Sequence, residues 1–460
     1  MKIWQLTYYN LVVDIFGGET VTGLKARRTR ESVLAYLFLL PSLIILSIFT
    51  FWPIGFSFVL SFFKWDFRNM KNPYFYGFGN YKEILKFDYP VKFPLYKGIL
   101  YSALYISLAF LTIVFIFLIA EMLLKRRVDV KGSIFLVSYL TLIVLYFIVR
   151  SQLSILILSI LLVAVAILMF ALLYKKLVDS KLMKEHIWLG FTMWLLCYVL
   201  LEFKFSGVFK NQSYGIIDYF IDASEKNLFF KALTNTTYYV ILTVPIGLIL
   251  SLLIALLLNN EIKFKAFFRT SFFIPFVTSS VAVGLIWKWI YNDDVGLLNY
   301  LLVSMGMQPV KWLKDAKWTI PTVSIVAIWK TVGYNAMIFL AGLQNIDTFY
   351  YEAADVDGAN SLQKFLKITW PLLSPTTFFL LIVSVIGAFK VFQEVFILYD
   401  GLPGPYGNSG MTMVYYVFDL FYRQQRMGIA SAAAYLLFLV ILVFTFIQYR
   451  VGDKVVEYVS

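Results

Sequence analysis

Long apolar runs separated by short charged stretches make up most of this 460-residue chain. Runs with few or no charges recur at lengths of about 20 residues, which is what an α-helix needs to cross roughly 30 Å of hydrocarbon. The pattern predicts an all-α polytopic membrane protein with about ten transmembrane helices. The predicted spans lie near residues 33–63, 99–124, 132–149, 153–174, 187–203, 232–258, 270–291, 319–346, 371–399 and 428–449.

Basic clusters between the runs orient these helices. Short cytoplasmic loops collect Lys and Arg, and Lys25, Arg27, Arg28 and Arg30 precede the first run. This run is far longer than the apolar part of a signal peptide, so we expect it to remain as the first span. With ten crossings both termini are predicted to be cytoplasmic.

Composition supports a membrane protein and excludes several chemistries. The hydrophobic fraction of 60% exceeds that of soluble domains. The net charge of +13 lies in short clusters between apolar runs, so we assign it to topology and to contact with anionic lipids of the bilayer, not to nucleic acid. A single cysteine, Cys197, and a single histidine, His186, leave neither an internal disulfide nor a His/Cys metal cluster. No segment matches G-x-x-x-x-G-K-[ST], the phosphate-binding loop of many ATPases.

A polar island, "EAADVDGAN" at 352–360, interrupts the apolar sequence between two predicted spans. It lies in loop 344–370, which the topology places inside the cell. We expect two short helices there, the first capped by Asp347 or Thr348 and ended by a left-handed turn at Gly358. Small alanines would let such a helix enter a groove closely, and its carboxylates would offer acceptors to a basic partner.

The island and the sequence around it resemble a known family. Glu352, Ala353, Ala354, Gly358, Ile368 and Pro371 stand at the spacings of the Glu-Ala-Ala motif of the transmembrane subunits of binding-protein-dependent ABC importers, with Trp370 where that motif prefers Leu. Stretches within 33–87 and 229–450 resemble the sugar-permease branch of the maltose-transporter type.

The resemblance implies a cell-membrane importer of a prokaryote, with a translocation path shared with a second permease subunit. Loop 344–370 would couple to cytoplasmic ATPase subunits, which would bind ATP and Mg²⁺, and this chain would hold no cofactor and would not be an enzyme. A solute-binding protein would deliver a sugar at the extracytoplasmic loops, including the Gly/Pro-rich segment 400–410. The implied coupling residues are Glu352, Ala353, Ala354, Asp355, Asp357, Gly358, Ile368 and Pro371.

The family's permease core has six spans, so the remaining four are interpreted as an insertion. Because these four are nearly uncharged, we expect a peripheral, lipid-facing bundle. The predicted organisation is a cytoplasmic N-terminal segment 1–32, for which an interfacial position is the alternative, a first core helix 33–63, an extracytoplasmic loop 64–98, an inserted bundle 99–203, a second extracytoplasmic loop 204–230, the permease core 231–450 and a cytoplasmic tail 451–460.

Ionisable residues inside predicted spans suggest a substrate pathway, because a charge in lipid is costly unless it faces a cavity or a partner. Lys330 lies within 319–346, and Lys390 and Glu394 are spaced i, i+4 within 371–399. A sugar needs polar groups for its hydroxyls and an aromatic ring for its C–H faces. The candidate pathway residues are Lys330, Thr331, Tyr334, Asn335, Ser384, Gly387, Lys390, Gln393 and Glu394.

Structural roles remain open for several of these residues. Lys330 could snorkel or bond a carbonyl, Lys390 and Glu394 could neutralise each other, and Tyr334 could simply pack. By resemblance Tyr334 matches an aromatic substrate contact of the maltose-type permease. The asparagines of that site are replaced by Ala388 and Val391, which leaves the sugar's identity open.

Two other functional classes compete with an importer subunit. An ion-coupled carrier working alone would use Lys330, Lys390 and Glu394. A polytopic membrane enzyme, such as a lipid-linked glycosyltransferase, would need an acidic or histidine-bearing cluster at a membrane face. Asp355 and Asp357 are the only close acidic pair on an inside loop, and their i, i+2 spacing puts them on different sides of a helix.

Overall fold

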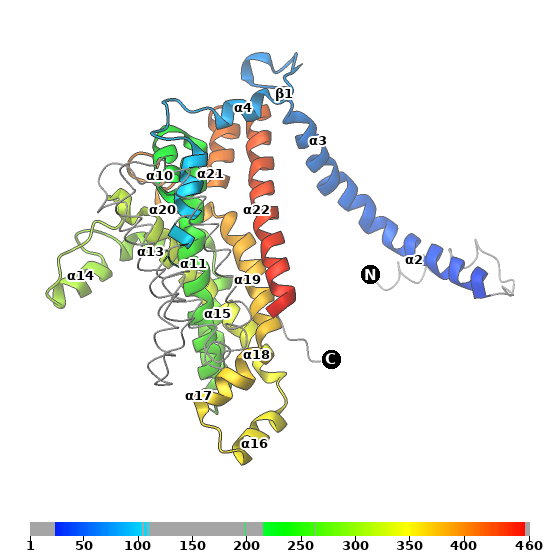
Figure 1. Ribbon diagram of the computed structural model, residues 1–460, viewed down its shortest axis with the longest axis vertical. Coiled ribbons are helices and arrows are strands. Elements are labelled where there is room, and N and C mark those ends of the chain that lie inside the picture. The colour runs from blue at the N-terminus through cyan, green and yellow to red at the C-terminus, as the bar shows by residue number, and fades with distance from the viewer. Residues whose placement is uncertain are drawn as a thin grey trace, which may run out of the picture. The chain divides into compact units, whose positions relative to one another are not determined.

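The computed structural model describes residues 24–103, 105–107, 109, 198, 215–261 and 263–455 (Figure 1). The N-terminal part of the predicted segment 1–32 and nearly all of the predicted insertion 99–203 lie outside the described residues, as do the last five residues, 456–460. The described part is helical apart from one two-stranded sheet. The predicted all-α fold class is therefore confirmed.

The chain divides into two compact units, one made of residues up to Ile84 together with Val417–Leu442, the other of Leu85–Tyr416 together with the C-terminal residues. In the first unit an apolar span, Glu31–Leu60, contains a π-helical turn at Ser47–Phe51 and leads into the small sheet. Its elements are α2 Leu24–Leu46, α3 Trp52–Leu60, β1 Phe63–Lys64, β2 Tyr74–Phe75, most of α4 Gly79–Leu85 and the first half of α22 Met427–Val455.

Close backbone contact holds α22 in the first unit. The Gly428 N–H donates to the carbonyl of Trp65 at 3.0 Å, and a Cβ on Gly428 would lie 2.1 Å from the carbonyl oxygen of Phe63. Ala430 and Ala433, from the small-residue run 428–435, are at most 2% exposed within this single chain. Packing inside the chain therefore accounts for this run.

The second unit contains the rest of the core. Its long helices pack on one another through small residues, as is usual for membrane helices: Ser251 donates to the carbonyl of Val332 at 3.0 Å. Its elements are α10 Ile216–Lys226, α11 Leu228–Asn259, α12 Lys265–Val277, α13 Ser280–Ile290, α14 Leu297–Ser304, α15 Thr319–Gln344, α16 Thr348–Val356, α17 Ser361–Lys364, α18 Trp370–Leu372, α19 Ser374–Phe389, α20 Gln393–Leu398 and most of α21 Met413–Phe418.

Four helices of the described ranges are long and apolar enough to cross a membrane, and up to six if each of two bent pairs is counted as one span. The single helices are Glu31–Leu60, Leu228–Asn259, Ala316–Gln344 and Met427–Arg450. The bent pairs are Lys265–Val277 with Ser280–Ile290, and Ser361–Leu372 with Ser374–Phe389. Each of the six overlaps a predicted core span, but Ser361–Leu372 of the last pair lies almost wholly in the predicted loop 344–370. The total of ten spans remains a prediction.

Two predicted spans are not the continuous helices that the apolar pattern suggested. Span 270–291 is broken at Thr278 and Ser279, neither of which has a helical backbone, and its halves meet at 98°. Span 371–399 bends by 62° near Leu373 and breaks again between Phe389 and Gln393. Hydropathy records only that a segment is apolar, so it does not register these interruptions.

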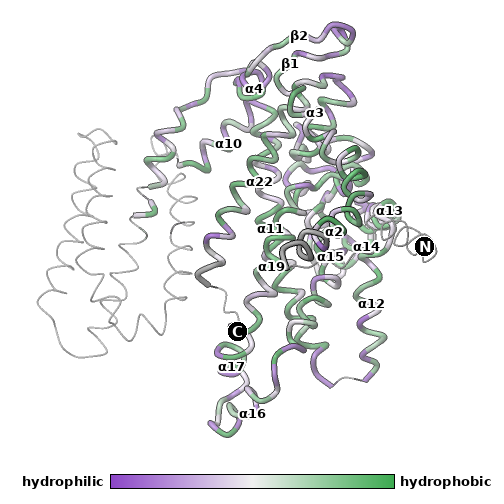
Figure 2. Tube along the Cα trace, turned by 90° about the vertical axis from the view of Figure 1, so that its right-hand side faces the viewer, coloured by the Kyte–Doolittle hydropathy of each residue, from purple (hydrophilic) through white to green (hydrophobic). Residues whose placement is uncertain are grey.

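The hairpin of α16 and α17 lies at one end of α11 and α15, and α10 lies at the other end (Figure 1). Figure 2 shows hydrophobic residues concentrated along long helices such as α11 and α19, and hydrophilic residues interspersed with hydrophobic ones at the α16–α17 hairpin. The polar island at 352–360 is thus displayed beyond the apolar part of the second unit.

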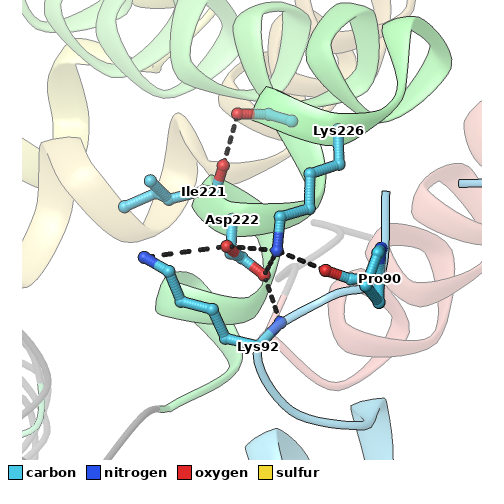
Figure 3. A network of polar contacts seen from close by, with 6 residues as sticks. Pro90, Lys92, Ile221, Asp222 and Lys226 are labelled. Carbon is cyan, nitrogen blue, oxygen red and sulfur yellow. Dashed lines mark hydrogen bonds and ion pairs between the residues drawn. The ribbon is translucent and has the colours of Figure 1, made fainter. Parts of the chain in front are cut away.

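An ionic network fastens α10 to the segment near residue 90 (Figure 3). Asp222, 4% exposed, accepts hydrogen bonds from the Lys92 backbone N–H at 2.8 Å and from the Lys226 ammonium at 3.0 Å, and Lys226 also donates to the carbonyl of Pro90 at 2.6 Å. Burial alone would raise the pKa of Asp222, but these hydrogen bonds and the two lysine charges together lower it below its ordinary value of 3.8. The carboxylate therefore stays ionised and pins α10 in place.

Candidate functional site

A cavity of about 660 Å³ opens among α11, α12, α15 and α19 in the second unit. Its volume is in the range of small-molecule sites. Eight of the nine predicted pathway residues line it: Thr331, Tyr334, Asn335, Ser384, Gly387, Lys390, Gln393 and Glu394. Only Lys330 is missing from its wall.

Tyr334 forms an aromatic platform at this cavity. Its ring stacks on that of Phe276 with centroids 4.2 Å apart and an interplanar angle of 11°. The stack requires α12 to lie very close to α15, which Gly333 allows because a Cβ there would lie 1.7 Å from the backbone oxygen of Phe272. Tyr334 therefore packs against Phe276 through one face of its ring and still lines the cavity. The two alternatives for this residue, packing and a place in the pathway, each describe part of its environment.

Polar groups around the platform are available to a ligand. Among the described residues, no hydrogen bond engages the Tyr334 hydroxyl or the side-chain amides of Asn335 and Gln393. Apolar walls with a few convergent polar groups are typical of sites that fix the orientation of a small molecule.

The predicted i, i+4 placement of Lys390 and Glu394 on one helix face is wrong, because the helix is interrupted between them. α19 ends at Phe389, and the freed carbonyl of Val391 accepts a hydrogen bond from Thr412 Oγ1 at 2.8 Å. In the part of the chain that is described, Lys390 has no ion pair, and its exposed side chain lines the cavity.

Glu394 instead approaches Lys330. The Lys330 ammonium lies 4.0 Å from Glu394 Oε1 and donates a hydrogen bond to Ser280 Oγ at 2.5 Å. The two charged side chains are only 16% and 19% exposed. Lys330 therefore neither snorkels nor bonds a carbonyl, the two structural alternatives suggested by its position.

The polar island forms the expected helical hairpin. Asp347 Oδ1 accepts from the Phe349 N–H at 2.9 Å and caps α16, and Gly358 takes the left-handed conformation with φ +72°. An ion pair between Lys364 and Asp355 and a hydrogen bond of 3.0 Å between Tyr351 Oη and Thr369 Oγ1 brace the two arms.

The predicted coupling residues lie on the hairpin and at the start of the next helices. Ala354, Asp357, Gly358 and Ile368 line a shallow pocket of about 400 Å³, and Pro371 is half-buried within α18. Glu352, Ala353, Asp355, Asp357 and Gly358 are exposed. One carboxylate oxygen of Asp355 is occupied by Lys364, so Glu352 and Asp357 are the freer acceptors.

Comparison with known proteins identifies the chain. The model of the family described as "binding-protein-dependent transport system inner membrane component" matches residues 223–457, which is just over half of the 460 residues. The chain belongs to this family.

Two similar curated proteins are sugar permeases by name. The chain is 39% identical over 234 residues to the arabinooligosaccharides transport system permease protein AraP of Halalkalibacterium halodurans, covering 49% of this chain and 73% of the relative. It is 35% identical over 226 residues to the lactose transport system permease protein LacF of Rhizobium radiobacter, covering 48% and 75%. A crystal structure of a bacterial alginate ABC transporter aligns with a TM-score of 0.47 and 26% identity, covering 61% of this chain and all of that chain.

Family membership makes the chain a permease component of a prokaryotic cell membrane and not an enzyme. The matched region contains both the cavity, whose lining runs from Tyr239 to Val414, and the α16–α17 hairpin. The described helices that can span a membrane agree with an inner membrane component.

Sequence reasoning missed the wall that α11 contributes to the permease cavity. Tyr239, Thr243 and Gly247 line it, and Ser251 continues the same face. These four residues recur every fourth position on an otherwise apolar helix, which places them on one side. That stripe of polar and small residues was the available signal.

The Gly/Pro-rich segment 400–410 of the permease is not helical, and side-chain hydrogen bonds hold it in place. Ser409 Oγ and Thr319 Oγ1 lie 2.8 Å apart, and Asn235 Nδ2 donates to the carbonyl of Met411 at 2.9 Å. Tyr406, at the tip, is 70% exposed. The segment thus presents an aromatic side chain on a fixed backbone.

Proposed function

We propose that this permease forms, with a second permease subunit, the path by which a sugar or oligosaccharide enters the cell. A solute-binding protein delivers the sugar from outside, and two cytoplasmic ATPase subunits, which bind ATP and Mg²⁺, drive the cycle through loop 344–370. Both termini are cytoplasmic in this proposal, and 99–203 forms a peripheral bundle in the lipid.

The cavity supports a saccharide as the transported solute. A sugar ring presents C–H groups on its faces and hydroxyls around its rim, which suits the stacked Tyr334 ring and the unengaged amides of Asn335 and Gln393. The named substrates of AraP and LacF are an arabinooligosaccharide and lactose, which belong to the same chemical class.

The observation that carries the proposal of an ATP-driven importer is the exposure of α16. None of its residues is buried, and Phe349 and Val356 are 68% and 89% exposed next to the carboxylate of Glu352. A helix with exposed apolar and acidic side chains, beyond the apolar part of the protein, fits a protein partner better than lipid. A lone carrier or a membrane enzyme has no need of such a surface.

Copurification and transport together test the proposal. The permease is expressed with the genes beside its own, isolated through a tag on its C-terminus, and reconstituted in vesicles. We expect ATPase subunits and a second permease to copurify, and saccharide uptake to require ATP and the solute-binding protein. Saccharide uptake by this chain alone in vesicles would refute the importer and favour the ion-coupled carrier.

A further inference from the structure

The side chain of Lys330 lies where two interrupted helices meet. Its ammonium donates to Ser280 Oγ, at the start of α13 directly after the break that separates it from α12. Glu394 Oε1, 4.0 Å from the same nitrogen, belongs to the first turn of α20, directly after the break that separates it from α19. One half-buried cation thus contacts the first turns of two helices that lack a continuous helical connection to the preceding span.

A second pocket, of about 610 Å³, is bordered by Ser280, one of the two partners of Lys330. Its lining includes Ser279, Ser280, Phe392, Gln393 and Asp400. Phe392 and Gln393 also line the main cavity, so these two residues are a wall common to both spaces. Ser280 and Glu394, the two partners of Lys330, flank this wall.

Contacts, and not backbone continuity, must keep the wall in place. α13 and α20 pack so closely that a Cβ on Gly284 would lie 2.4 Å from Ile397 Cγ2, and Lys288 forms an ion pair of 2.5 Å with Asp400 farther along the two helices. At the near end, beside the breaks, Lys330 supplies the corresponding link. Removing one member of a poorly solvated charged pair leaves the other unpaired, which favours rearrangement.

We propose that Lys330 is a positioning residue that holds the wall between the two spaces closed, and that it does not contact the saccharide. With Lys330 in place, residues 392–393 separate the cavity from the second pocket. Release of its contacts lets α20 move away from α13 and joins the two spaces. In the proposed topology the second pocket lies on the extracytoplasmic side. The inference rests on the proposed function in this respect alone, that the wall closes the cavity toward the outside of the cell.

Thiol accessibility in the assembled importer tests this role without a saccharide or ATP. Cys197, the chain's one cysteine, is replaced by serine, and Ser384→Cys, in the cavity wall, provides the reporter. A membrane-impermeant, cationic methanethiosulfonate is added outside intact cells. We expect Lys330→Met to raise the rate of modification at least about tenfold, as a tenfold shift toward an open wall would.

Further variants separate a positioning role from general damage. Lys330→Arg keeps the charge and should leave the rate near that of the parent. Glu394→Lys alone should raise the rate, and the exchange Lys330→Glu with Glu394→Lys should bring it back down, which a misfolded protein would not do. Lys314→Met removes the ion pair of 2.7 Å with Asp293, on the loop that follows α13, and should leave the rate unchanged.

The inference is overturned if Lys330→Met inserts normally and modification stays at the parental rate, or if Lys314→Met raises the rate equally. It is also overturned if the rise appears only when the reagent is applied to the cytoplasmic face of inverted vesicles. Failure of the ATPase subunits to copurify would refute the proposed function and leave these rates as a separate result.

Discussion

Gly333→Ala is the substitution whose effect follows most directly from the geometry. A Cβ at this position would lie 1.7 Å from the Phe272 oxygen and 2.4 Å from its carbonyl carbon. Both are backbone atoms of α12, so no side-chain rotation can relieve the overlap. α12 would have to retreat by roughly 1.7 Å to bring the oxygen to 3.4 Å, where ordinary van der Waals contact begins.

This retreat has an energetic and a functional cost. Overpacking of a well-packed interior typically costs about 1–3 kcal/mol, and a clash with backbone belongs at the upper end of that range. A shift of α12 also carries Phe276 away from Tyr334, whose rings stack at 4.2 Å. We therefore expect the variant to insert in the membrane, to unfold at a lower temperature and to lose most of its saccharide uptake.

The measurement is the midpoint of thermal unfolding of the purified permease in detergent, followed by tryptophan fluorescence. Gly55→Ala is the matched control, because Gly55 is also in an apolar helix and a Cβ there has nothing within 4 Å. Alanine is favoured over glycine in a helix by up to about 1 kcal/mol, so the control should be neutral or slightly stabilised. Equal midpoints for the two variants would refute the argument that Gly333 is required by close approach of α12.

Three other predictions concern the hairpin, the platform and the α10 network. Glu352→Lys should leave the protein inserted and uncouple saccharide uptake from ATP hydrolysis, and normal uptake would contradict the coupling role of α16. Tyr334→Ala should lower uptake while ATPase subunits still copurify, whereas unchanged uptake would exclude the ring as a ligand. The lowered pKa of Asp222 contributes stability that is present above its ordinary value of 3.8 and is lost as pH falls through the lowered value. Asp222→Asn should remove this acid-dependent loss when the midpoint of thermal unfolding is measured at a series of pH values. The same pH profile for variant and parent would argue against the network.

The core spans and most of the cavity could be predicted because they depend on local rules. Tyr334 and Asn335 lie three and four positions after Thr331, which brings them to the same side of a helix as Thr331 wherever that helix packs. The cap at Asp347 and the left-handed turn at Gly358 were likewise predictable, since each depends only on neighbouring residues. That these groups share one cavity with α11 required the structure.

The helix breaks could not be predicted, because they are held by residues far away in sequence. The carbonyl of Val391 is satisfied by Thr412, 21 positions later, and Lys330 bonds Ser280, 50 positions earlier. An apolar segment with an isolated polar residue predicts a continuous helix unless the distant hydrogen-bond partners of that segment are known. The predicted placement of Lys390 and Glu394 on one helix face was wrong for this reason: their i, i+4 spacing requires a helix that does not continue between them.

The breaks also suit a transport path. Backbone outside a helix is tolerated at membrane depth only where it is buried in protein or borders water, because exposed N–H and C=O groups have no partner in lipid. Residues 390–394 border the cavity, and 279–280 border the second pocket. Irregular backbone therefore occurs where a passing solute or water can satisfy it.

The position of the hairpin explains how motion at one end of the permease would reach that cavity. α15 leads directly into α16, and α17 leads through α18 into α19, so one loop joins the helix that bears Tyr334 to the helix that bears Ser384. The Tyr351–Thr369 hydrogen bond and the Lys364–Asp355 ion pair tie the two arms together, which favours movement of the loop as one body. A partner that shifted α16 would then displace two walls of the cavity at once. Because the wall at residues 392–393 depends on side-chain contacts beside the two breaks, such a displacement would act on the part of the cavity least held by continuous helix.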